Sequence, residues 1–158
     1  MQRFFILIAT AITLTFIPFQ IFAADLIETA SNSGTSKIFL AAVKTAGLTE
    51  TLKNSGPYTV FVPTDAAFEK LPAGALEALL KDKNRLAQVL TYHVIPGKVM
   101  IAEVKPGKVK TMQGNLLTLT SDNGKVTVND ANVIQSDMTA DNGVIHEVDA
   151  LVLPKAPQ

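Results

Sequence analysis

The hydrophobic pattern of this chain changes its period once, near residues 95–97, and that change constrains the fold more than any other feature. Before it, apolar residues recur every three or four positions, as on one face of an α-helix. After it, short apolar runs are separated by turn residues at a spacing of about ten, as in a β-sheet. Helices followed by strands predict an α+β fold, with the N-terminal helices packed on a mostly antiparallel sheet.

One helix is predicted before the chain's first strand and another after it. One covers about residues 36–47, where Ser36 can cap the start and Gly47 can close the end. The other runs from about Asn84 to Tyr92-His93, with apolar residues again at helical spacing.

Between these helices, the apolar run 58–62 is bounded by prolines and predicts a buried strand. A short helix should follow directly, capped by Thr64 or Asp65. Phe68 lies on the apolar side of this helix, and we expect it in the core.

The C-terminal half contains a clear hairpin signal. Two alternating segments, 117–120 and 125–128, flank Asn123-Gly124, a pair that tolerates the positive φ angles of tight turns. Further strands are predicted at 133–134, 144–145 and 151–153.

The first 23 residues have the pattern of a cleavable secretory signal peptide. Arg3 is followed by an uncharged, largely apolar stretch, and Pro18 interrupts that stretch before the small residue Ala23. The alternative interpretation is an uncleaved membrane anchor, because about 20 apolar residues can span a bilayer. We expect cleavage after Ala23, no membrane insertion afterwards, and a secreted product, in the periplasm or outside the cell.

Composition limits the remaining chain to one domain, predicted over 24–154, with a short tail at 155–158. Without Arg3, 13 basic side chains stand against 14 acidic ones, which argues against nucleic acid as a partner. The absence of cysteine excludes disulfides, a thiol nucleophile, thiolate metal sites and a lipid-bearing cysteine. No cofactor is expected.

Three segments resemble the signatures of the fasciclin-type adhesion domain, in the same order and spacing. They are 58–72, which is a strand entering a capped helix, the Tyr-His segment 92–97, and 142–154. One departure is Glu147, where the family usually has an apolar residue. The resemblance implies a wedge of β-strands joined to a layer of several helices, and a role in adhesion without catalysis.

The resemblance also marks individual residues. Six of them belong to its structural signatures: Thr64, Asp65, Phe68, Asn142, Gly143 and His146. In animal relatives, an Asp followed by an apolar residue contributes to receptor binding, and the matching pair here is Asp137-Met138, with Met in place of Ile. Tyr92 and His93 of the Tyr-His segment complete the candidate binding residues.

The two histidines are the first candidates for chemistry. His93 and His146 both lie in apolar contexts and outside any catalytic or zinc-binding spacing, which favours buried, hydrogen-bonded imidazoles over a metal ligand or general base. We therefore predict no catalytic residue and no metal site. Asp149 is expected to pair with a backbone group or a cation. Four aspartates have a spacing that does not form a calcium loop, and turns explain most of them: Asp122, Asp130, Asp137 and Asp141.

Three functions remain open from the sequence. The first is a non-catalytic binding module that mediates cell-surface or matrix adhesion through contacts with a protein or polysaccharide. The second is a periplasmic small-molecule carrier or enzyme that uses a histidine-lined pocket. The third is a structural subunit that binds copies of itself.

Overall fold

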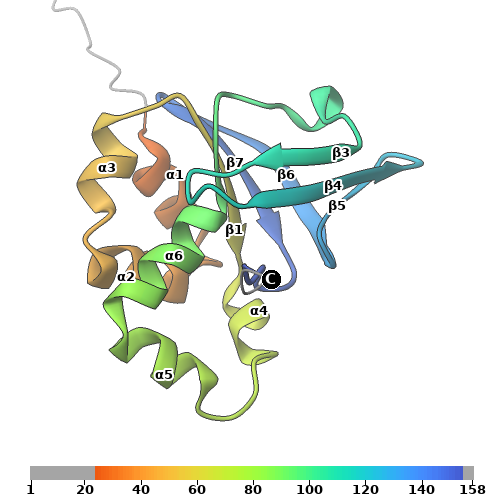
Figure 1. Cartoon of the computed structure of the whole chain (residues 1–158). Helices are drawn as coiled ribbons and strands as arrows, with labels where there is room; N and C mark the ends of the chain where they lie inside the picture. The colour runs from red at the N-terminus through yellow and green to blue at the C-terminus, as the bar shows by residue number, and fades with distance from the viewer. Residues whose placement is uncertain (1–23, 155–158) are drawn as a thin grey trace, which may run out of the picture.

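The computed structural model describes residues 24–154 and arranges them as a group of helices beside a strongly curved sheet (Figure 1). The helices are α1 Leu26–Ser33, α2 Lys37–Ala46, α3 Thr49–Asn54, α4 Asp65–Glu69, α5 Ala75–Lys81, α6 Lys83–Tyr92 and the 3-10 turn η1 Ile101–Glu103. The strands are β1 Tyr58–Pro63, β2 Val94–Pro96, β3 Gly107–Lys110, β4 Leu116–Asp122, β5 Lys125–Val128, β6 Ala131–Ala140 and β7 Gly143–Val148. The predicted signal peptide and tail lie outside the described residues.

The seven strands form one sheet in the order β2-β1-β7-β6-β5-β4-β3. Among the neighbouring pairs of the described residues, β1–β7 is parallel and the others are antiparallel. The two ends of the sheet approach each other, since the Met112 N–H donates to the Val94 carbonyl at 2.8 Å. The sheet is therefore nearly closed, and the predicted α+β fold with a mostly antiparallel sheet is confirmed.

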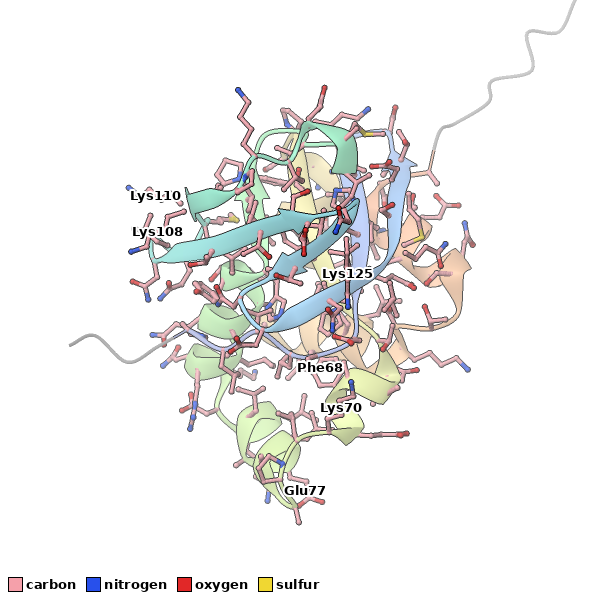
Figure 2. The ribbon with its side chains drawn as sticks, turned by 90° about the vertical axis from the view of Figure 1, so that its right-hand side faces the viewer. Phe68, Lys70, Glu77, Lys108, Lys110 and Lys125 are labelled. Atoms are coloured by element: carbon pink, nitrogen blue, oxygen red, sulfur yellow. The ribbon has the colours of Figure 1, made fainter. Side chains whose placement is uncertain are left out.

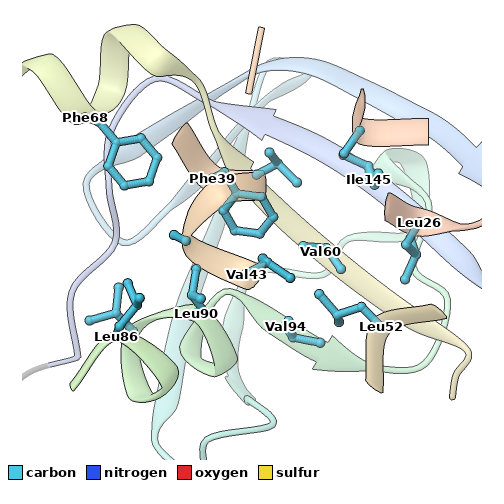
Figure 3. Close-up of a cluster of buried hydrophobic side chains, with 14 of the residues drawn as sticks. Leu26, Phe39, Val43, Leu52, Val60, Phe68, Leu86, Leu90, Val94 and Ile145 are labelled. Atoms are coloured by element: carbon cyan, nitrogen blue, oxygen red, sulfur yellow. The ribbon is translucent and has the colours of Figure 1, made fainter. Parts of the chain in front are cut away.

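The curvature of the sheet creates two hydrophobic cores, and β1 contributes to both. Val60 and Val62 face the helices, in a cluster that includes Phe39, while Phe61 faces the interior of the curled sheet. Figure 3 shows the helix-side core, with Phe68 of α4 at its margin. Burial on both faces explains why the sequence of β1 is continuously apolar rather than alternating.

Most predicted elements are present, but two local predictions are wrong. Ser36 occupies the position before α2, yet its side chain makes no capping hydrogen bond. The Asp65 carboxylate caps that helix instead, because it accepts the Ile38 N–H at 2.8 Å. Residues 151–153 form no strand, since the Val152 N–H donates to the His93 ring rather than to a neighbouring strand.

Candidate functional site

The His93 side chain lies at the end of α6 and is completely buried. Its Nδ1 lies 2.7 Å from the Val89 carbonyl, and its Nε2 accepts the Val152 N–H at 3.0 Å. These partners fix a neutral ring that carries its proton on Nδ1. Burial lowers the pKa of His93 to about 4, although the bond to Val89 acts in the opposite direction. This imidazole is a structural link between α6 and the C-terminal segment.

His146 lies in the middle of β7 and is also completely buried. Its Nε2 lies 2.8 Å from the Val99 carbonyl, and its Nδ1 accepts the Asp137 N–H at 3.1 Å. The ring is therefore neutral with its proton on Nε2, the opposite tautomer to His93. Burial lowers the pKa of His146, while the bond to Val99 and the charge of Asp137 act to raise it. Both imidazoles use both of their nitrogens, so the geometry gives no support to a histidine-lined pocket.

Tyr92, a predicted binding residue with His93, faces the interior of the curled sheet and is buried. Its hydroxyl donates to the Leu116 carbonyl at 2.8 Å and accepts from the Asn129 amide at 3.1 Å. The Tyr-His segment therefore connects the helices to the far strands of the sheet. The predicted binding role of Tyr92 and His93 stays a prediction. Both side chains are buried, so neither presents surface to a partner.

The Asp137-Met138 pair lies in β6, at an irregularity in its pairing with β7. Asp137 has a positive φ of 59°, and its carboxylate accepts the Ile101 N–H at 2.8 Å. Met138 packs partly buried against the helix-side core. Sequence analysis does not predict that this pair belongs to a ten-residue strand, or that Asp137 holds the turn η1 in place. A receptor-binding role for the pair stays a prediction.

The joint between β1 and α4 uses its two polar residues as caps of two different helices. The Thr64 hydroxyl accepts the Ala67 N–H at 3.3 Å and thereby caps α4. Asp65 caps α2 across a sequence separation of 27 residues. Phe68, 2% exposed, then packs into the helix-side core as predicted. These signature residues hold the strand and the two helices together.

Asn142 and Gly143 perform a similar task at the start of β7. The Asn142 side chain accepts the Leu26 N–H at 3.0 Å and donates to carbonyls at the end of α3, among them Ser55 at 3.0 Å. Gly143 lies so close to β1 that a Cβ atom would be 2.0 Å from the Tyr58 carbonyl oxygen. Gly143 is therefore required by the close approach of the backbone, and Asn142 by the hydrogen bonds of its side-chain amide.

Asp149, whose partner is left open by the sequence, pairs with both a backbone group and a cation. Its carboxylate accepts from the backbone and side-chain nitrogens of Asn132 at 2.8 and 3.0 Å, and the Lys70 ammonium group lies 4.0 Å away. Burial acts to raise the pKa of Asp149, but the Asn132 hydrogen bonds and the charge of Lys70 outweigh it, so the pKa is lowered. Asp149 thus anchors the segment that follows β7 to the start of β6.

The structure reveals one polar feature that sequence analysis does not predict as a site. Glu147 is 2% exposed, and Thr35 donates a hydrogen bond to its carboxylate. It lies in an open depression of about 490 Å³. The residues that line this depression are Thr35, Thr64, Asp65, Ala66, Ile134, Gln135 and Glu147. A lone acidic residue in an otherwise apolar strand was the available signal, but its partner Thr35 is 112 residues away in the sequence and could not be predicted.

Two further features of the described residues concern metal sites and membrane spans. Within residues 24–154, no group of three or more His, Asp or Glu side chains is arranged to hold a metal ion. Among the same residues, none of the helices combines the length and apolar character needed to cross a membrane.

Comparison with known proteins agrees with this arrangement. Protein sll1483 of Synechocystis sp. is 47% identical over 134 residues, covering 84% of this chain and 74% of that protein. Another Synechocystis protein, sll1735, is 37% identical over 130 residues, covering 82% of this chain and 97% of its own length. Human periostin is 38% identical over 119 residues, covering 73% of this chain but only 14% of periostin.

The solved structures include a similar fold. The FAS1 domain pair of the insect cell adhesion molecule Fasciclin I superposes with a TM-score of 0.66 at 15% identity, covering 84% of this chain and 51% of that one. Coverage of about half of that chain is expected when a single domain is compared with a pair of domains. Residues 34–154 match the Fasciclin domain family. Because that match spans most of the chain, the chain belongs to the Fasciclin domain family.

Proposed function

We propose that this chain is an exported, non-catalytic binding module that mediates contact with a cell-surface or matrix partner, either a protein or a polysaccharide. One observation carries the proposal: the polar side chains of the family signatures form hydrogen bonds inside the fold. His93, Asn142 and His146 each bond to groups from distant parts of the chain. Buried polar groups that are satisfied in this way stabilise a fold and are not available to a substrate.

The relatives support the same class of function. The Fasciclin domain is a module of adhesion and matrix proteins, and its known members are mostly non-catalytic. Fasciclin I is named an insect cell adhesion molecule. The matched part is 14% of periostin and 18% of the pig transforming growth factor-beta-induced protein ig-h3, so the activities of those whole proteins do not transfer as a unit.

Export rests on the N-terminal segment. Residues 4–24 carry no charged side chain, and a single arginine precedes them. A basic start, an apolar stretch and a small-residue end are typical of a signal for secretion. Fractionation of cells that express the full chain tests this part: we expect the protein outside the cytoplasm, with an N-terminus at residue 24. A full-length protein in the cytoplasmic fraction would contradict it.

The binding function is tested with the chain from residue 24 onward, immobilised through its C-terminus. Cell-envelope extract and a panel of purified polysaccharides are passed over it, with the heat-unfolded chain as the control for nonspecific adsorption. We expect saturable retention of a defined protein or polysaccharide on the folded chain alone. The absence of any ligand at high micromolar concentration in both screens would count against the proposal.

A further inference from the structure

The Glu147 carboxylate occupies an unusual position for an acidic residue. It is two residues from Ile145 in β7, so it shares the helix-side face of the sheet and does not point outward. Its side chain is almost completely buried, yet the Thr35 hydroxyl is the one hydrogen-bond donor to it among the described residues. A carboxylate has about four acceptor positions, and burying it with so few donors costs free energy.

The surroundings of Glu147 contain a second carboxylate and no cation. Asp65 also lines the depression, and its protein partner is the backbone N–H of Ile38. No lysine, arginine or histidine is among the lining residues, and no ion pair within residues 24–154 involves either carboxylate. The depression therefore carries two acidic groups whose charge the described part of the fold does not neutralise.

The rest of the depression is apolar or weakly polar. Ile134 is 56% exposed, which is high for a large aliphatic side chain, and Ala66 is exposed as well. They provide hydrophobic surface beside the buried carboxylate. A ligand that suits this arrangement combines an alkyl segment with a terminal cation that has several N–H donors.

We propose that the depression around Glu147 binds the side chain of a lysine presented by a partner protein. The ammonium group supplies three N–H donors to the carboxylates, and the four-carbon stem packs on Ile134 and Ala66. A metal ion suits the site less well, because no group of three acidic or histidine ligands exists within residues 24–154. An amino sugar would place a hydroxylated ring against the apolar wall. The inference rests on the proposed binding function and specifies the chemistry of the partner.

The test is a titration of the isotopically labelled chain, from residue 24 onward, with Nα-acetyl-lysine methylamide, followed by amide chemical shifts. We expect saturable shifts at the lining residues, among them Thr35, Gln135 and Glu147. Glu147→Gln should weaken binding about tenfold, because it removes the charge from the hydrogen bond and keeps the shape. Ile134→Ser, at an exposed position, should weaken binding several-fold without unfolding the chain.

Two controls separate specific binding from general electrostatics. Glu69→Gln changes the net charge by the same amount at an exposed position of α4 outside the depression, and it should leave the affinity unchanged. The norleucine analogue, which lacks the ammonium group, should not bind. Equal weakening by Glu69→Gln and Glu147→Gln, binding of the norleucine analogue, or a preference for glucosamine or Ca²⁺ would each overturn the lysine site. The screens with envelope extract and polysaccharides are a separate measurement, so their success would leave the binding function standing if the lysine site failed.

Discussion

At the scale of single residues, the two histidines show how a fold determines the properties of a titratable group. His93 and His146 have opposite tautomers, because a carbonyl faces Nδ1 of one ring and Nε2 of the other. Each ring also accepts a backbone N–H, so protonation would replace a hydrogen bond by a repulsive contact. Burial acts in the same direction, since it disfavours the charged form.

The lowered pKa of His93 predicts a dependence of stability on pH. Its ordinary value is 6.5 and its folded value about 4, so the unfolded chain binds the proton more tightly. The contribution is therefore fully present above pH 6.5 and is lost as the pH falls from 6.5 to 4. Between pH 7 and pH 5, we expect the free energy of unfolding in urea to fall by about 2 kcal/mol from this residue.

The matched control is His93→Gln, which cannot titrate in this range. The variant should be less stable than the wild type at pH 7, but its stability should change less between pH 7 and pH 5. If the free energy of unfolding of the variant fell as much between pH 7 and pH 5 as that of the wild type, other groups would be the cause of the pH dependence.

At the scale of elements, the joint between β1 and α4 is held by packing as well as by caps. Phe68 is 2% exposed in the helix-side core. Phe68→Ala removes this contact and leaves a cavity, so we expect a loss of about 3–5 kcal/mol in the free energy of unfolding, measured in urea. A loss under about 1 kcal/mol would show that the ring contributes little to the core.

The parallel pairing of β1 with β7 depends on the absence of a side chain at Gly143. An added Cβ would lie 2.0 Å from the backbone oxygen of Tyr58, and backbone cannot rotate away as a side chain does. Gly143→Ala should therefore destabilise the chain by at least about 2 kcal/mol, measured as the shift of the urea midpoint. A midpoint within error of the wild type would contradict this close approach.

The terminal strand β3 carries exposed lysines, which oppose pairing of this edge of the sheet with another chain. Lys108 and Lys110 alternate along it and project into solvent (Figure 2). Charged side chains at the edge of a sheet oppose pairing with another copy. Replacing both by Thr should produce larger species in light scattering than the wild type gives at the same concentration. Replacing Lys125 in β5 by Thr removes one charge away from the edge and is the control for each single variant, Lys108→Thr or Lys110→Thr. Equal association of the control and the single edge variants would contradict a protective role of the edge lysines.

The elements were predictable from sequence wherever the signal was local. The hairpin at Asn123-Gly124 forms as expected, because the residues that define a tight turn are adjacent in the chain. The cap of α2 was not predictable, since Asp65 is 27 residues from its partner and outcompetes the adjacent Ser36. The environment of Glu147 was hidden for the same reason: Thr35 reaches it across 112 residues of sequence.

At the scale of the whole molecule, the polar residues divide into an inner and an outer set. The inner set belongs to the family signatures, and it connects helices, strands and the C-terminal segment by hydrogen bonds between distant parts of the chain. The outer set includes the Glu147 depression and the lysines of β3, where a partner has access. The central claim is that the buried signature residues His93, Asn142 and His146 build the fold, whereas binding belongs to surface features such as the depression lined by Asp65 and Glu147.

One measurement tests that claim most directly: the long-range ¹⁵N–¹H spectrum of the two imidazoles, recorded from pH 8 to pH 5. We predict two neutral rings of opposite tautomer, with the proton on Nδ1 of His93 and on Nε2 of His146. We also predict that the His93 signals keep their neutral pattern down to pH 5. Rings that share one tautomer, or a His93 that titrates near pH 6.5, would show that the signature histidines are not buried structural groups and would contradict the account.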